Sequence, residues 1–330
     1  MSERVALIGA GTMGGVHAQA WKALPDVDLV AVLDPRRQAA DALGPAYTDW
    51  DTMLSQTRPD IVDICVPTPF HREYVERAAS AGKAIFVEKP LSRTLADCDA
   101  IVETVERAGV PTMAGHVLRY FPEYATAKRL VDEGAVGTPA AVRTSRMAGF
   151  PHQGIDDWYA DSAKSGGVVL DMILHDFDWL RWTFGPVARV FACGLYGRPR
   201  YAGEIDYALV TLRFASGAVG HVTGSWAHPG GFRTTLEIAG DGGMIEHDSA
   251  RSAPLMASLR ATGSAGGGVA VPDSPMAEGE DPYFLEIQAF LNALRAGMPP
   301  PVTVHDAREA TRIALAALES IETGKVVNLQ

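Results

Sequence analysis

Short apolar runs and helical repeats of apolar residues alternate along the first third of the chain. The runs have the length of buried strands, and they lie at 4–8, 29–34, 60–67, 83–90 and 110–116. Apolar residues at helical spacing predict helices between them, at about 35–43, 70–81 and 94–108. Regular alternation of strand and helix is typical of a parallel, doubly wound sheet. This part of the chain therefore predicts an α/β fold.

The pattern changes after about residue 120. Helices are expected at about 120–133 and, as one continuous element, at 166–184. Strand-like runs with little helix between them lie at 140–148, 187–193, 206–214, 218–227 and 233–240. Turns of Ser-Gly or Gly-Gly between such runs favour a mostly antiparallel sheet. Helices at 283–296 and 305–323 close the chain.

A length of 330 residues suits two domains, which we place at 1–120 and 121–330. The terminal helix could pack back near the first domain. The segment 260–281 is rich in Gly, Ser and Pro, and it is expected to form a mobile loop.

Composition and charge narrow the range of partners. The formal net charge is −11 and there is no basic tail, which argues against nucleic acids and acidic membranes, because phosphate binding needs clustered Lys and Arg. No apolar run approaches the ~20 residues that a bilayer requires, and the N-terminus lacks the features of a signal peptide. Cys65, Cys98 and Cys193 give neither a disulfide framework nor a zinc pattern, and Cys65 is expected to be buried. We therefore expect a cytoplasmic protein.

A glycine motif follows the first predicted strand. Residues 9–14 read Gly-Ala-Gly-Thr-Met-Gly, which matches G-x-G-x-x-G between a strand and a helix. Gly9 permits a tight turn, Gly11 lets the backbone approach a pyrophosphate, and Gly14 allows close packing of helix on strand. The N–H groups at the helix start, around Thr12 and Met13, would face the phosphates. The motif predicts a dinucleotide site in a Rossmann domain.

Asp34 ends the second predicted strand. An acid at this position accepts hydrogen bonds from the ribose hydroxyls and repels a 2′-phosphate, which favours NAD over NADP. Arg36 and Arg37 complicate this assignment, because either could stack on adenine or pair with a 2′-phosphate, although a solvated helix start is their commoner role.

Glu88, Lys89 and Pro90 follow the fourth predicted strand, at the carboxyl edge of the sheet where ligands bind in such folds. A lysine beside a nicotinamide ring could donate a hydrogen bond to a substrate oxygen. The alternative is an ordinary surface charge, which the position between an apolar strand and a proline disfavours.

A second cluster of polar residues lies in the apolar segment 166–184. Asp171, His175 and Asp178 share one face of the predicted helix, and Asp176 falls on another. A carboxylate one turn from an imidazole fixes its tautomer and suits it to act as a general base. The alternatives are a surface Asp–His pair and a metal held by Asp171 and His175. Since the neighbouring residues are apolar nearly all round, we expect a buried helix with a catalytic pair and no metal.

Four motifs together resemble those of the Gfo/Idh/MocA family of sugar and polyol oxidoreductases, most closely the inositol dehydrogenase branch. They are GAGTMG at 9–14, VPTPFH at 66–71, EKP at 88–90 and GGVVLDMILHDFD at 166–178, and the ending at 302–327 is similar to the family's terminal helix. The resemblance covers nearly the whole chain. It implies an N-terminal Rossmann domain and a C-terminal α/β domain whose open sheet presents substrate groups. That sheet often forms the oligomer interface, so we expect a homo-oligomer, either a dimer or a tetramer.

The resemblance also implies roles for single residues. The catalytic set is Lys89, Asp171 and His175, and Asp178 also faces substrate. The cofactor set comprises Gly9, Gly11, Thr12, Met13, Gly14, Asp34, Arg36, Thr68, Pro69, His71 and Glu88. His116 and Arg119 are expected to contact substrate. They lie in GHVLRY, where the family often has G-F-x-x-R-F, and His116 and Tyr120 depart from that pattern. Trp158 and Tyr159 could stack on a sugar face.

These observations predict an NAD-dependent oxidoreductase that moves a hydride between nicotinamide and a secondary alcohol of a polyol, inositol or sugar-like substrate. His175 would take the hydroxyl proton, Lys89 would hold the same oxygen and Asp171 would orient the imidazole. Two alternatives stay open. One is a nucleotide-sensing regulator with the same fold, and the other is a reductase of another carbonyl, an imine or an unsaturated ring.

Overall fold

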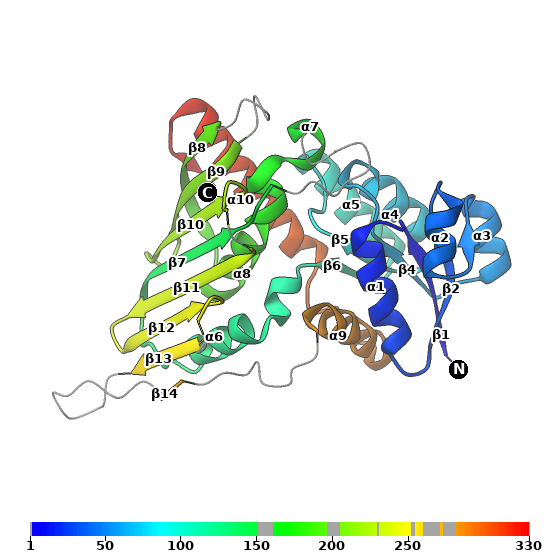
Figure 1. Ribbon diagram of the computed structural model, residues 1–330, viewed down its shortest axis with the longest axis horizontal. Helices are drawn as coiled ribbons and strands as arrows, with labels where there is room; N and C mark the ends of the chain where they lie inside the picture. The colour runs from blue at the N-terminus through cyan, green and yellow to red at the C-terminus, as the bar shows by residue number, and fades with distance from the viewer. Residues whose placement is uncertain are drawn as a thin grey trace. The chain divides into compact units, whose positions relative to one another are not determined.

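The computed structural model describes residues 2–150, 161–196, 205–229, 231–251, 255–259, 271–272 and 281–329 (Figure 1). The chain divides into two compact units, one of 1–117 with 280–311 and the other of 118–279 with 312–330. The segment 280–311 therefore clusters with the N-terminal residues, whereas the sequence analysis placed it in the second domain.

The first unit contains a parallel six-stranded sheet in the order β3-β2-β1-β4-β5-β6. Its strands are β1 (Glu3–Ile8), β2 (Val27–Leu33), β3 (Ala46–Tyr47), β4 (Ile61–Ile64), β5 (Ala84–Glu88) and β6 (Thr112–Gly115). All five predicted strands are confirmed. The two-residue β3 was not predicted, since so short an element carries no periodicity. This strand order is that of a dinucleotide-binding Rossmann sheet.

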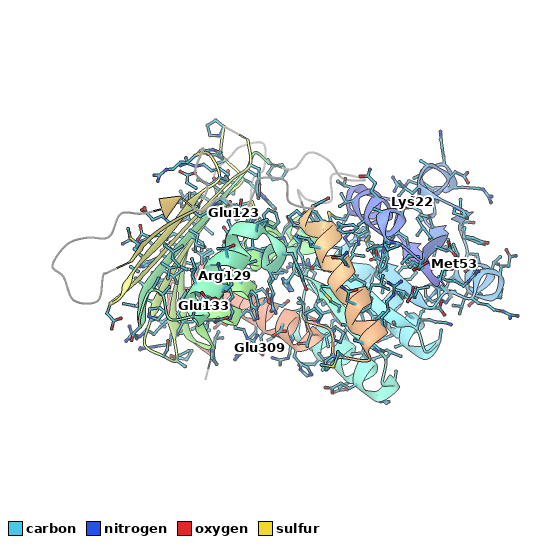
Figure 2. All side chains as sticks on the ribbon, turned by 90° about the horizontal axis from the view of Figure 1, so that it is seen from below. Lys22, Met53, Glu123, Arg129, Glu133 and Glu309 are labelled. Carbon is cyan, nitrogen blue, oxygen red and sulfur yellow. The ribbon has the colours of Figure 1, made fainter. Side chains whose placement is uncertain are left out.

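Helices connect these strands as expected. They are α1 (Thr12–Ala23), α2 (Arg37–Leu43), α3 (Trp50–Thr57), η1 (Thr68–Phe70), α4 (His71–Ser80) and α5 (Leu95–Ala108), with α9 (Pro282–Ala296) and the start of α10 (Val304–Thr323) added from the C-terminal part. The unpredicted α3 begins where the Asp49 side chain accepts a hydrogen bond from the Thr52 N–H, and it buries Met53 (Figure 2). Phe290 of α9 packs edge-on against Phe86 of β5, which ties the late helix into this core.

The second unit contains a nine-stranded sheet in the order β14-β13-β12-β11-β7-β10-β9-β8-β15. Its strands are β7 (Pro139–Met147), β8 (Val187–Tyr196), β9 (Ile205–Phe214), β10 (Val219–Ser225), β11 (Arg233–Gly240), β12 (Gly243–Asp248), β13 (Leu255–Leu259), β14 (Val271–Pro272) and β15 (Val327–Asn328). Neighbouring strands are antiparallel except β7 and β10, so the expectation of a mostly antiparallel sheet is confirmed. The strands β12 to β15 were not predicted.

One face of this sheet packs against helices. Figure 1 shows α6 (Pro122–Asp132) and α8 (Leu174–Phe184) on the same face. Tyr124 of α6 and Trp179 of α8 pack edge-on and are fully buried. On its outer side α6 carries a surface ion pair between Arg129 and Glu133, one turn apart (Figure 2). The unit also contains η2 (Val117–Tyr120) at its start, the short α7 (Ser162–Ser165) and the end of α10 from Arg312 onward.

The expected continuous helix at 166–184 is wrong. Instead, a π-helical turn η4 (Val168–Met172) precedes α8, and Ile173 separates the two with its N–H donating to the Val168 carbonyl. Gly224 of β10 lies so close to this turn that a Cβ there would be 2.6 Å from the Ile173 side chain. π-Helical turns are rare in proteins, and those that occur are often found at functional sites.

Two further findings bear on the sequence-based expectations. Within the described ranges, no helix is long and apolar enough to cross a bilayer. Of the expected mobile loop at 260–281, all but 271–272 and residue 281 lies outside the described residues.

Candidate active site

The glycine motif forms the turn between β1 and α1. Gly9 has a φ of +102°, which a side chain rarely tolerates, and a Cβ there would lie 2.6 Å from the Cys65 carbonyl oxygen. A Cβ on Gly14 would collide with the Gly9 carbonyl oxygen. These two glycines are therefore required by the packing of the turn itself.

The start of α1 fits a pyrophosphate. Gly11, its N-cap residue, is exposed and has open space where a Cβ would stand. No side chain caps the helix, and its first turn holds no acidic residue, so its first N–H groups and positive dipole are not neutralised by side chains. Thr12 and Met13 lie in this turn. The residues present thus fit the dinucleotide phosphates.

Asp34 follows β2 and lies beside this turn. Its carboxylate accepts hydrogen bonds from the Ala10 N–H at 2.8 Å and from the Arg36 N–H at 2.8 Å. The Arg36 guanidinium also pairs with it, at 3.0 Å from Nε and 3.0 Å from Nη2. Burial alone would raise the pKa of Asp34, but these hydrogen bonds lower it below its usual range. The acid is therefore ionised and fixed, as a ribose-binding carboxylate must be.

The VPTPFH segment leaves β4 and forms η1. Thr68 is buried and Pro69 is exposed. The buried His71 ring bridges two carbonyl groups, with Nδ1 at 2.9 Å from the Pro90 oxygen and Nε2 at 2.9 Å from the Val66 oxygen. Burial lowers the pKa of His71, and the hydrogen bonds to the Val66 and Pro90 carbonyl groups partly oppose this shift. His71 therefore ties this segment to the end of the EKP motif.

Lys89 is half-buried directly after β5, and the peptide bond between Lys89 and Pro90 is cis. The Glu88 carboxylate accepts a hydrogen bond from the Lys89 N–H at 2.9 Å. Gly115 of β6 pairs with Glu88, and the next residue, His116, is fully buried. Lys89 and His116 thus follow adjacent strands at the carboxyl edge of the same sheet.

Asp171 and His175 lie in the second unit, on either side of the break between η4 and α8. Within residues 168–180 they are the two positions that are not buried. An acid and an imidazole are thus the partly exposed positions of an otherwise buried segment, and their catalytic pairing stays a prediction. The π-helical turn changes the helix between them, so the ideal helical spacing assumed from the sequence does not apply.

Asp178 is placed differently from Asp171 and His175. It is fully buried and forms a two-point ion pair with Arg119 of η2, in which Arg119 Nε and Nη2 lie 2.7 Å and 2.5 Å from its oxygens. Asp176, also buried, accepts a hydrogen bond from Nε of Arg146 on β7 at 2.7 Å. The two ion pairs attach α8 to η2 and to the sheet. Asp178 and Arg119, both expected at substrate, are thus bonded to each other.

Trp158 and Tyr159 lie outside the described residues. Cys65 is half-buried rather than buried, with Sγ at 3.2 Å from His17 Nδ1. His17 and its partner Asp63 are both fully buried, and neither was predicted as a functional residue. A signal was present, because Asp63 interrupts an otherwise apolar strand.

Comparisons with known proteins agree with this geometry. Residues 3–116 match the model of an oxidoreductase family with an NAD-binding Rossmann fold, and residues 124–246 match the GFO/IDH/MocA C-terminal domain. The myo-inositol 2-dehydrogenase of Thermotoga maritima is 32% identical over 99% of this chain and 98% of its own length. The scyllo-inositol 2-dehydrogenase (NAD(+)) of Bacillus subtilis is 33% identical over 99% of this chain and 96% of its own length.

A solved structure shows the same architecture. Levoglucosan dehydrogenase in complex with NADH superimposes with a TM-score of 0.89 at 25% identity, covering 100% of both chains. The resemblance inferred from the motifs is confirmed. Because the family models match both parts of the sequence and the inositol dehydrogenases align over nearly its full length, the chain belongs to the GFO/IDH/MocA family of oxidoreductases, with an NAD-binding Rossmann domain at its N-terminus.

Proposed function

We propose that this protein is a dehydrogenase that oxidises a secondary hydroxyl of inositol, another polyol or a sugar-like substrate with NAD. The observation that carries the proposal is the exposure pattern of 168–180, which leaves Asp171 and His175 accessible in an otherwise buried segment. Relatives of nearly equal length are named inositol dehydrogenases, which supports the substrate class.

Each residue has a distinct role in this proposal. His175 accepts the hydroxyl proton as a general base, and Asp171 orients its imidazole. The Lys89 ammonium donates a hydrogen bond to the same oxygen and stabilises its negative charge as the carbonyl forms. When bound, NAD supplies the acceptor for the hydride that leaves the substrate carbon. The glycine turn, Asp34 and the segment around Thr68 would hold it.

Asp178 and Arg119 have a supporting role in this proposal. Since each satisfies the other in a buried two-point pair, we assign them the positioning of α8, which carries His175, rather than contact with substrate. His116, buried at the end of β6, stays a candidate for substrate contact.

A direct assay tests the function. The protein is incubated with NAD and a panel of inositol isomers, linear polyols and sugars, and the absorbance of reduced nicotinamide is followed. Turnover of at least one cyclic polyol or sugar is the expected result. Tight NAD binding without turnover on any alcohol would favour the regulator. Oxidation of reduced cofactor only by an imine or an unsaturated ring would favour the other alternative.

Replacing Asp34 with Ser should shift cofactor preference toward NADP. The change removes the acceptor for the ribose hydroxyls and releases the Arg36 guanidinium, which now pairs with Asp34, for a 2′-phosphate. Losing a hydrogen bond to a charged group should change the ratio of the two dissociation constants by about 10- to 100-fold. Both constants are measured by titration, and the double variant Asp34→Ser/Arg36→Ala should lose the gain. Equal affinity of the wild type for both cofactors would contradict the assignment.

We further propose a homo-oligomer that forms through the open face of the second sheet. Phe191 and Leu195 of β8 and Leu209 of β9 are 39%, 62% and 43% exposed, while the residues on either side of Leu209 are buried. Cys193, opposite Leu209 across the strand pair, is exposed on the same face. A second copy of this chain would cover these apolar side chains.

With three cysteines not in disulfides, we place the protein in the cytoplasm.

Leu209→Lys should therefore lower the oligomeric mass measured by light scattering, because a charge would be buried at the interface. Met298→Lys is the matched control, since Met298 is 63% exposed in the first unit and is not on this sheet. An unchanged mass for Leu209→Lys, or a monomeric wild type, would disprove this interface.

A further inference from the structure

His17 is a fully buried histidine in the helix that starts at the glycine motif. Its ring lies between two buried carboxylates from two neighbouring strands. Nδ1 is 2.9 Å from an oxygen of Asp63 on β4, and Nε2 is 3.1 Å from Oε1 of Glu88 at the end of β5. Both ring nitrogens thus lie at hydrogen-bond distance from a carboxylate acceptor. A neutral imidazole carries one N–H, whereas the doubly protonated imidazolium can donate to both carboxylates.

The surroundings of the ring support this protonation state. Burial is the largest single effect and lowers the pKa of His17, but the charge of Asp63 and the other contributions of Asp63 and Cys65 together outweigh it and hold the pKa well above its ordinary value. The Trp21 indole N–H also donates to Asp63, at 2.6 Å, and keeps that carboxylate in place. Burial raises the pKa of the Cys65 thiol, so this neighbour stays neutral at physiological pH.

The second oxygen of Glu88 continues the line of contacts to the EKP lysine. Oε2 accepts the Lys89 N–H at 2.9 Å while Oε1 holds the His17 ring. A Cβ on Gly115, the β6 neighbour, would lie 3.3 Å from the Glu88 carboxyl, so the glycine leaves this carboxylate the space that it occupies. The line Asp63–His17–Glu88 therefore joins the cofactor-binding helix to the backbone of Lys89.

We propose that His17 is a positioning residue that fixes the backbone of Lys89 through Glu88. The inference rests on the proposed function, in which Lys89 acts on the substrate oxygen. A lysine side chain has many rotamers, so an anchored backbone limits where its ammonium can reach. A displacement of about 1 Å at a reacting group can cost on the order of 10²-fold in rate. His17 touches neither substrate nor cofactor in this account.

A metal is the competing explanation for the same cluster. Donor atoms of His17, Asp63 and Cys65 lie within 4.8 Å of one another. However, Nδ1 is already at hydrogen-bond distance from Asp63, and the Trp21 N–H is directed at the same carboxylate. A metal would require His17 to lose the proton on Nδ1 and Cys65 to become a thiolate, against the direction of its pKa.

Two variants separate the contact of His17 with Asp63 from its contact with Glu88. The amide nitrogen of Asn in His17→Asn takes the place of Nδ1, so it can reach Asp63 but not Glu88. The amide nitrogen of Gln in His17→Gln takes the place of Nε2, so it can reach Glu88 but not Asp63. Each variant loses one charge-assisted hydrogen bond and the same positive charge. Both should lose comparable free energy of unfolding, which chemical denaturation measures.

Turnover should nevertheless differ between them. We expect kcat of His17→Asn to fall by about 10- to 100-fold with little change in the dissociation constant for NAD, and kcat of His17→Gln to stay within about fivefold of the wild type. Equal kcat for the two variants, while Lys89→Ala is inactive, would overturn the positioning role and leave the proposed function intact. Near-normal turnover of Lys89→Ala would instead contradict the proposed function. A stoichiometric metal in the purified wild type, lost in both variants, would also overturn the inference.

Stability against pH gives a second readout. The pKa of His17 is raised in the folded state, so its proton stabilises the fold fully below the ordinary value of ~6.5, and this contribution is lost as pH rises through the raised pKa. The difference in unfolding free energy between the wild type and His17→Gln should therefore shrink as pH rises from about 6 to about 9. The titratable or charged groups that interact with the ring or with its neighbours include Asp63, Cys65, Glu88, Lys89 and, on α9, Tyr283 and Glu286. A difference that does not vary with pH would show that the ring is neutral and would contradict the assigned network.

Discussion

Replacement of His175 with Asn should lower alcohol oxidation by about 10²- to 10⁴-fold, the usual contribution of a general base. Asn keeps a polar side chain of similar size and removes the group that takes the proton. His175 is half-buried, and it follows the π-helical turn in a segment whose other residues, apart from Asp171, are buried. The substitution should therefore disturb packing little, and thermal unfolding of the variant should resemble that of the wild type.

The pH dependence of the rate gives the decisive measurement. Oxidation requires the neutral imidazole, whose ordinary pKa is ~6.5, so kcat/KM of the wild type should rise with pH through the imidazole pKa and then level off. In His175→Asn this acid limb should disappear. His305→Asn is the matched control, because His305 is an exposed histidine that pairs with Glu106 on the surface. If the acid limb persists in the variant, another group takes the proton, and His116 becomes the next candidate.

Much of the fold follows from the chain's local patterns. The parallel sheet was predictable because its strands are buried on both faces and read as unbroken apolar runs. The second sheet was harder to delimit, since β12 (Gly243–Asp248) mixes polar and apolar residues directly after a glycine turn. The π-helical turn could not be predicted, because the segment 168–180 is apolar nearly all round. Such a segment shows no clear alternation of polar and apolar faces that would reveal a change in helix type.

The residues of the candidate site could be predicted only where they belong to a local sequence motif. Asp171, His175 and Asp178 look equivalent in sequence, yet only the fold reveals that Arg119, 59 positions away, binds Asp178 in the core. His17 was missed for the same reason. Its two partners lie 46 and 71 positions away, and no local spacing relates them. A buried ion pair depends on tertiary contacts, and periodicity cannot detect it.

Lys89→Ala should lose turnover far more than affinity for NAD. In the proposed mechanism the ammonium donates to the oxygen on which negative charge develops, and removing one positioned donor from such a site costs on the order of 10²- to 10³-fold in rate. NAD is held elsewhere in the same unit, by the uncapped start of α1 and by Asp34. The dissociation constant for NAD, measured by titration, should therefore change by less than about threefold.

The choice of control decides whether this result concerns chemistry or charge. Lys83 lies directly before β5 and Lys89 directly after it, so the two lysines flank one strand at opposite edges of the sheet. Lys83→Ala removes the same charge from the amino edge, where no ligand site is expected, and it should leave kcat and the NAD affinity near wild type. Equal losses in both variants would indicate a general electrostatic effect of the unit. Near-normal turnover of Lys89→Ala would remove Lys89 from the mechanism, because alanine cannot donate a hydrogen bond to the reacting oxygen.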